Sequence, residues 1–241
     1  MFVDAHLHCA EINDIDKYVN SSNWKIACVS DDIESSHRVL EISRIHSEKI
    51  IPCVGVHPWV IHEHNLKIVR SALDRALLEH QIICLGEVGL DKRFKPDTYP
   101  IQLEFFTLFL NYAKEYDLSM NLHAAGAWRE VFERVYQYDI QKAYFHWYTG
   151  PLDLLSQIES IGYYVGINPS WIIQDKHRVV IEKTNIGSII TESDAPYRYK
   201  GLELKPDLIK NTIEYLSRIK ELNIEVVKKV VLSNFNKLFS K

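Results

Sequence analysis

The amino-acid sequence predicts a (β/α)8 TIM barrel, allowing for distortion, with polar residues gathered at the C-terminal ends of its strands. Eight short apolar runs alternate with segments of helical spacing, and such alternation is typical of a parallel sheet with crossover helices. The 241 residues also match the size of one such barrel. A doubly wound open sheet is the alternative. However, the first strand ends in His6-Leu7-His8 rather than in a glycine-rich phosphate loop, which disfavours a dinucleotide-binding fold.

The expected elements follow from hydrophobic periodicity, which has a period of two in strands and about 3.6 in helices. Apolar runs predict strands at residues 2–9, 24–30, 50–58, 82–89, 118–123, 143–146, 163–168 and 188–191. Helical spacing predicts helices at 15–19, 33–48, 66–78, 100–116, 128–138, 152–161, 176–182, 208–216 and 226–239. Since no linker or low-complexity segment interrupts this alternation, we expect one domain over residues 1–241.

The charge balance does not by itself indicate a nucleic-acid or membrane partner. The 28 basic and 32 acidic residues give a net charge of −4, whereas a DNA-binding scaffold is more often basic; an enzyme needs only a local basic patch. No run approaches the roughly 20 apolar residues of a membrane span, and the N-terminus lacks the features of a signal peptide. We therefore expect a cytoplasmic protein that does not bind membranes.

The four cysteines, Cys9, Cys28, Cys53 and Cys84, lie in or beside apolar runs and form no CxxC pair. Buried, reduced thiols are the expectation for such cysteines in a cytosolic protein, in preference to metal binding or disulfides.

Imidazoles and carboxylates recur at the ends of the predicted strands. In a barrel these ends meet at one face, and such side chains are ligands for divalent metals. A single histidine at a strand end is more often a core or loop residue, but five of them together with two acids favour a metal site. The set is His6, His8, His57, Glu87, His123, His146 and Asp194. Glu87 could bridge two ions, while His57 could instead support a ligand or contact phosphate. We expect the remaining histidines, including His177, on helix or loop surfaces.

Taken together, several motifs resemble the TatD family of metal-dependent deoxyribonucleases, which are amidohydrolase-like TIM barrels. The resemblance runs from residue 4 to about residue 197 and follows the order of the family. The motifs are Asp-Ala-His-Leu-His at 4–8, Gly-Val-His-Pro at 55–58, Gly-Glu-Val-Gly-Leu-Asp at 86–91, His123, His146 and Thr-Glu-Ser-Asp-Ala-Pro-Tyr at 191–197. Many members carry His-x-Arg at the fifth strand, where this chain has His123-Ala124-Ala125.

The resemblance implies two divalent ions (Mg²⁺, Mn²⁺ or Zn²⁺). His6, His8, Glu87 and Asp194 would hold one ion, and Glu87, His123 and His146 the other. It also implies phosphodiester hydrolysis, often as a 3′-to-5′ exonuclease on DNA, with single-stranded or frayed ends as the expected substrate.

Roles follow as hypotheses. Asp194, assisted by Glu87, would position and deprotonate the attacking water, and His57 would contact a non-bridging oxygen. Trp147 would stack on a base and Arg198 would contribute to a basic rim. Glu192 would orient a metal ligand, or is simply a hydrogen-bonded loop acid. Two alternatives stay open: an amidohydrolase-type deacylase or small-molecule phosphoesterase on the same barrel, and a non-enzymatic subunit with a vestigial site. The complete ligand set argues against the second.

Overall fold

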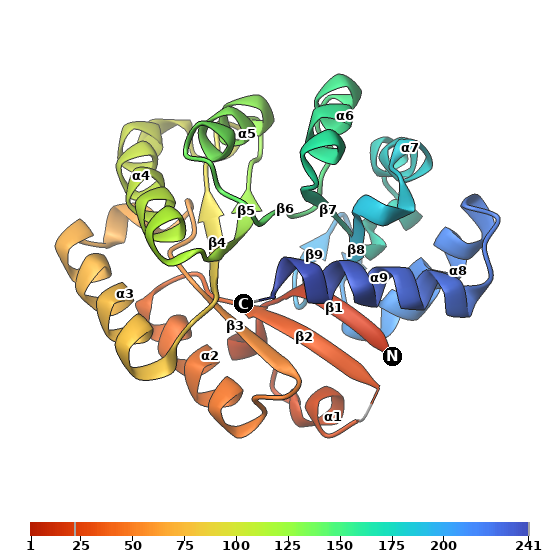
Figure 1. The fold of residues 1–241 in the computed structure, drawn as a ribbon, viewed down its shortest axis with the longest axis horizontal. Coiled ribbons are helices and arrows are strands. Elements are labelled where there is room, and N and C mark those ends of the chain that lie inside the picture. Colours follow the sequence, from red (N-terminus) through yellow and green to blue (C-terminus); the bar gives the residue numbers. More distant parts are fainter. Residues whose placement is uncertain (22, 241) are drawn as a thin grey trace.

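The computed structural model of the protein describes residues 1–21 and 23–240 and has the predicted (β/α)8 architecture (Figure 1). Eight parallel strands follow one another around the sheet in chain order. They are β1 (Phe2–Leu7), β2 (Trp24–Val29), β3 (Ile50–Val54), β4 (Cys84–Gly89), β5 (Ser119–His123), β6 (Ala143–Phe145), β7 (Tyr164–Ile167) and β8 (Ile189–Thr191). This order excludes the doubly wound alternative, in which the strand order reverses within the sheet.

Hydrogen bonds between the first and last strands bring the two ends of the sheet together. The Thr191 hydroxyl donates to the Val3 carbonyl at 2.7 Å, and the Asp194 backbone N–H donates to the His6 carbonyl at 2.9 Å. The second bond has a direct consequence for the site, because it fixes the acid that follows β8 beside the histidine carried by β1.

Helices surround the strands (Figure 1), and each predicted helix is present within a few residues of its expected bounds. They are α1 (Asp16–Val19), α2 (Ile33–Ile45), α3 (Leu66–His80), α4 (Tyr99–Tyr116), α5 (Trp128–Gln137), α6 (Leu152–Ile161), α7 (Asp175–Lys183), α8 (Ile209–Ile219) and α9 (Ile224–Leu238). Local signals set several ends. Asp32 caps α2 by accepting from the Ser35 N–H, and Gly162, at φ +88°, ends α6, a backbone angle that glycine adopts at little cost.

Helix α9 crosses the N-terminal end of the barrel (Figure 1). The Asn234 amide donates to the Ile189 carbonyl at the start of β8. The Ser119 hydroxyl at the start of β5 donates to the Leu238 carbonyl. Because α9 occupies this end, the opposite end, where the strands terminate, is left for the functional site.

Three features differ from expectation. The structure pairs Cys9 with Cys28 and Cys53 with Cys84 as disulfides, so the prediction of reduced thiols is wrong. Adjacent strands β3 and β4 place Cys53 and Cys84 opposite each other, a proximity that sequence spacing does not reveal.

The prediction of a surface position for His177 is also wrong. This residue is fully buried on the inner side of α7, with Nδ1 2.8 Å from the Ser170 hydroxyl. A short hairpin, β9 (Arg198–Tyr199) with β10 (Leu202–Glu203), is an addition that the sequence did not predict. Across the described residues, none of the helices has both the length and the apolar character needed to cross a membrane.

Candidate metal centre

Glu87, near the end of β4, lies at the centre of the converging side chains and is 2% exposed. Its Oε2 lies 3.1 Å from His6 Nε2 and 3.8 Å from His8 Nε2. Its Oε1 lies 2.6 Å from His123 Nδ1 and 3.4 Å from His57 Nε2. The two carboxylate oxygens therefore face two different groups of nitrogens, which is the arrangement expected of a bridging carboxylate.

The first group contains His6, His8, Glu87 and Asp194. Asp194 Oδ1 lies 3.6 Å from His6 Nε2 and 3.5 Å from His8 Nε2, so the donor atoms surround one small space. Asp194 has a φ of +56°, a left-handed conformation that aspartate tolerates better than most residues. This turn, shortly after β8, aims the carboxylate toward the histidines of the neighbouring strand β1.

The second group differs in part from the predicted set. Glu87 and His123 lie together as expected, but His57 is their third neighbour, with Nε2 3.1 Å from His123 Nδ1. His146 is stacked on His6 at a ring separation of 3.7 Å, and its Nε2 lies 3.8 Å from Asp194 Oδ1. All seven predicted side chains therefore converge, while the neighbours of His57 and His146 are decided by the fold.

Four of these histidines also meet an acceptor on the ring nitrogen that points away from the centre. A neutral imidazole donates through one nitrogen and accepts through the other, so an outward donor leaves a lone pair facing inward. The outward contacts are His6 Nδ1 with Asn121 Oδ1 (2.8 Å), His8 Nδ1 with Asp31 Oδ2 (2.9 Å), His123 Nε2 with Asp91 Oδ2 (3.0 Å) and His146 Nδ1 with Glu192 Oε2 (2.9 Å). This pattern is the one found around metal-bound histidines, and the donor set fits divalent metal ions.

In His57 the ring nitrogen that points away from the centre accepts a hydrogen bond, whereas in the other four histidines it donates. Its Nδ1 accepts the Trp59 backbone N–H at 3.2 Å, so in the neutral ring the hydrogen is on Nε2, which faces Glu87 and His123. A nitrogen that carries a hydrogen has no lone pair for a metal. The geometry therefore makes His57 a hydrogen-bond donor at this site.

Sequence reasoning missed three of the outward partners, Asp31, Asp91 and Asn121. Asn121 precedes His123 by two residues on one strand, so both side chains face the same way, and this signal was available. Its amide Nδ2 donates to the Ala5 carbonyl at 2.8 Å, which turns Oδ1 toward His6. Asp31 and Asp91 are the second residues after β2 and β4, in the region where barrel enzymes carry functional residues.

Charge and burial shift the pKa of several groups. Burial alone would raise the pKa of Glu87, but the imidazoles of His57 and His6 hold it well below its ordinary value. Burial lowers the pKa of His123, yet the hydrogen bonds that its ring donates to the carboxylates of Asp91 and Glu87 raise it to about 9. For His146, burial and the neighbouring charge of His6 lower the pKa to about 3. A cation entering this site would displace protons from the histidines with raised pKa.

Glu192 is fully buried, and burial raises its pKa to about 7. It accepts hydrogen bonds from the Tyr144 hydroxyl, from His146 and from the Trp147 backbone N–H. These contacts match a residue that orients His146.

Trp147 is half-buried, has a φ of +42°, which is unusual for a bulky residue, and donates from Nε1 to Gln174.

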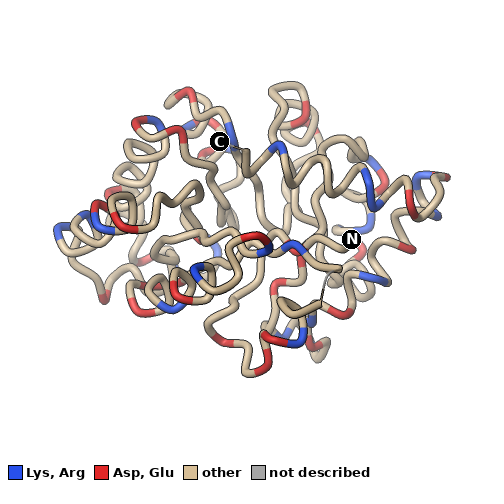
Figure 2. Tube along the Cα trace, turned by 60° about the horizontal axis from the view of Figure 1, so that its bottom comes forward, with Lys and Arg blue, Asp and Glu red and all other residues tan. Residues whose placement is uncertain are grey.

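The rim residues divide into packed and exposed side chains. Arg198 is 76% exposed and lies 3.9 Å from Glu203 within its own hairpin. Tyr148 is buried and donates to the Pro151 carbonyl, and Trp171 stacks on Tyr215, so these two rings pack the loops. Figure 2 shows acidic and basic residues interspersed along the outer helices, in keeping with the small net charge.

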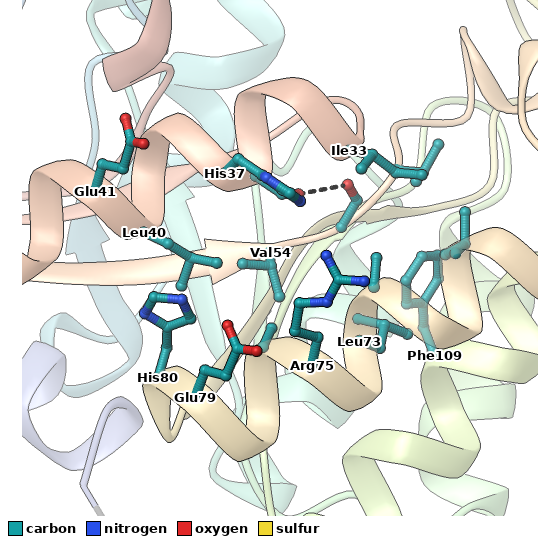
Figure 3. Close-up of a pocket in the computed structure, with 16 residues that line it drawn as sticks. Ile33, His37, Leu40, Glu41, Val54, Leu73, Arg75, Glu79, His80 and Phe109 are labelled. Atoms are coloured by element: carbon teal, nitrogen blue, oxygen red, sulfur yellow. Dashed lines mark hydrogen bonds between the residues drawn. The ribbon is translucent and has the colours of Figure 1, made fainter.

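A separate cavity of about 310 Å³ lies on the outside of the barrel between α2 and α3 (Figure 3). Leu40, Val54 and Leu73 contribute to its apolar lining, while Arg75 and Glu79 contribute polar groups. None of the candidate metal ligands lines it. The candidate metal centre at the strand ends is therefore separate from this cavity.

The fold and the converging donors define a metal-dependent hydrolase with a TIM barrel. The profile of the family described as TatD related DNase matches residues 3–240. The chain is 26% identical over 249 residues to a protein of Methanocaldococcus jannaschii named an uncharacterized metal-dependent hydrolase, covering 100% of this chain and 97% of that protein. It is 24% identical over 261 residues to human deoxyribonuclease TATDN3, covering 99% and 94%.

The crystal structure of YJJV, a TatD homologue from Escherichia coli, superposes with a TM-score of 0.88 at 22% identity, covering 99% of this chain and 97% of that one. The chain belongs to the TatD-related DNase family and is a metal-dependent hydrolase acting on ester bonds. The predicted fold class and family are thereby confirmed. Neither the deacylase or small-molecule phosphoesterase nor the vestigial subunit is favoured by these relatives.

Proposed function

We propose that this protein is a deoxyribonuclease of the 3′-to-5′ exonuclease type, acting on single-stranded or frayed DNA ends. The observation that carries the proposal is Glu87, whose two oxygens face two groups of nitrogens at the strand ends. A site for two adjacent ions suits phosphodiester cleavage, because both the attacking and the leaving oxygen need stabilisation. The deoxyribonuclease named among the relatives supports the same substrate class. We propose that residues 1–241 act as one domain.

Two divalent ions, Mg²⁺, Mn²⁺ or Zn²⁺, would be held by the inward-facing atoms. His6, His8, Glu87 and Asp194 would hold one ion, and Glu87, His123 and His146 the other. The outward hydrogen bonds of the four histidines support their role as ligands, since each leaves a lone pair facing the centre. When bound, such ions lower the pKa of water and stabilise charge on the phosphoryl oxygens.

The chain's own residues then have separable roles. Asp194 would accept the proton of the attacking water, since its carboxylate is aimed into the space bounded by three imidazoles. His57 would donate its Nε2 hydrogen to a non-bridging phosphoryl oxygen. Glu192 would hold His146 in orientation. Trp147 would belong to an aromatic group at the rim that contacts bases, and Arg198 would contribute positive charge there.

The test compares single-stranded DNA, duplex DNA, RNA, a generic phosphodiester and N-acyl amino acids, each with Mg²⁺, Mn²⁺ or Zn²⁺. A 5′-labelled single strand should shorten progressively from its 3′ end. Asp194→Asn should reduce the rate by at least about a hundredfold, which is the smallest effect expected from loss of a proton acceptor. Glu87→Gln should also reduce the rate, because an amide leaves only one oxygen to face the two groups of nitrogens. Hydrolysis of acyl substrates alone would contradict the proposal, as would wild-type phosphodiesterase activity in Asp194→Asn.

We further propose the cytoplasmic location expected from the sequence, which one observation opposes. The two disulfides of the structure are of a kind that is rare in reducing compartments. Fractionation of cells that express the full chain, combined with mass spectrometry of alkylated protein, measures both properties. Recovery of the protein outside the cytoplasm would overturn the location and leave the enzymatic proposal unaffected.

A further inference from the structure

Two aromatic side chains remain exposed on opposite sides of the metal centre. Phe94, shortly after β4, is 57% exposed, and Tyr197, shortly after β8, is 42% exposed. In a closed eight-stranded barrel, β4 and β8 lie across the mouth from each other. Exposed apolar surface at the rim of a polar site often belongs to a binding surface.

Phe94 is held against the metal centre by a short chain of contacts. Its ring packs edge-on against Trp59 at 5.8 Å, and Trp59 packs edge-on against His57 at 5.4 Å. Asp91 fixes both Trp59 and Phe94, because it accepts the Trp59 indole N–H at 2.5 Å and the Phe94 backbone N–H at 2.7 Å. The ring therefore has a defined position and still has much of its surface in solvent.

Tyr197 is supported in a similar way on the other side. Its backbone N–H donates to the Asp194 carbonyl at 3.0 Å, which links the ring to the acid of the metal centre. The ring packs edge-on against Trp147 at 6.0 Å, and Trp147 packs against Tyr199 at 5.0 Å. Trp147 is thus the support, and Tyr197 is the ring with the exposed surface.

Cationic side chains accompany both rings. The Arg93 guanidinium lies 5.2 Å from the centre of the Phe94 ring, and Arg198 directly follows Tyr197 with its side chain 76% exposed. Phe94 therefore has a cation against its ring, and Tyr197 is followed in the sequence by an exposed one. Aromatic surface and positive charge that attracts the backbone are found together in proteins that bind single strands.

We propose that Phe94 and Tyr197 are stacking platforms for unpaired nucleobases, one on each side of the scissile phosphate. This inference rests on the proposed nuclease function and specifies its substrate. A base can lie on such a ring only after it has left its own stack, so the two platforms select a single strand with nucleotides on both sides of the cleaved bond. The selectivity is for unpaired bases of any identity, since every base has a π face.

The test measures binding in EDTA, so that hydrolysis plays no part, by fluorescence anisotropy. The probes are a fluorescein-labelled oligothymidylate of about eight nucleotides and the same backbone with abasic units throughout. Phe94→Ala and Tyr197→Ala should each weaken binding of the oligothymidylate about tenfold, with a change below about twofold for the abasic strand. Phe94→Trp and Tyr197→Phe should bind the oligothymidylate as the wild type does, because each keeps an aromatic face.

Tyr136→Ala is the matched control, since Tyr136 is an exposed ring (59%) on the outer helix α5 and should leave both affinities unchanged. Equal weakening of the two strands, or no weakening of either, would overturn the platforms. A protein that shows the expected base-dependent binding but hydrolyses no phosphodiester would retain the platforms and refute the nuclease. Hydrolysis of DNA by the wild type, with unaltered binding in both alanine variants, would support the nuclease and refute the platforms.

Discussion

Asp91 offers the sharpest test of the outward hydrogen bonds. Its Oδ2 accepts from the Trp59 indole at 2.5 Å and faces His123 Nε2 at 3.0 Å. Its Oδ1 accepts the backbone N–H groups of Arg93 and Phe94 at 2.8 and 2.7 Å. All four partners are donors, so only a carboxylate, which accepts on both atoms, satisfies them together.

The substitution Asp91→Asn keeps the shape but replaces one acceptor with an NH₂ group. If the remaining oxygen keeps the two backbone contacts, the NH₂ group faces the Trp59 indole and His123 Nε2. The His123 ring then gains by accepting at Nε2, which moves its hydrogen to Nδ1, the atom 2.6 Å from Glu87. Loss of the carboxylate that accepts the outward hydrogen bond of a metal-bound histidine typically lowers metal affinity by 10- to 100-fold, which is about 1.4 to 2.7 kcal/mol.

Titration with Zn²⁺ or Mn²⁺ against a fluorescent chelator measures that affinity, and elemental analysis after dialysis gives the number of ions retained. Long-range ¹⁵N–¹H spectra of labelled histidines report which nitrogen of His123 carries the hydrogen. Asp139→Asn serves as the control, because Asp139 is 69% exposed and pairs with Lys114 on the outside of the barrel. Unchanged metal affinity in Asp91→Asn, together with a hydrogen still on Nε2, would refute the reasoning.

Three further predictions follow from other contacts. The folded pKa of His123 is raised from 6.5 to about 9, so the stability it confers is present below pH 6.5 and is lost as the pH rises toward 9. Melting temperatures in EDTA should fall across that window in the wild type and less in His123→Gln. In Gly166→Ala the new methyl would meet the Glu192 carboxylate and the Tyr144 hydroxyl. We expect urea unfolding to show destabilisation by about 1–3 kcal/mol. A midpoint equal to that of the wild type would contradict this close contact at residue 166. Reduction of the two disulfides should lower stability by about 2–4 kcal/mol each, and an unchanged midpoint in reductant would show that the cysteines are unpaired.

The sequence by itself determined the elements and the face on which the site lies. Short apolar runs marked the strands, and helical spacing marked the helices. The parallel barrel then requires all strand ends to meet. His6, Glu87 and Asp194 could therefore be assigned to one centre, although the last two are 107 positions apart in the sequence.

Tertiary structure alone decided how these residues pair. His57 lies beside His123 while His146 stacks on His6, because the distance between strand ends depends on barrel geometry and not on sequence spacing. The Asn121 contact with His6 spans 115 residues. The cysteine pairs and the buried His177 likewise depend on which strands and helices are adjacent. Hydrogen bonds and disulfides form between groups that are close in space, and a one-dimensional pattern predicts which face a side chain occupies but not the partner that it meets there.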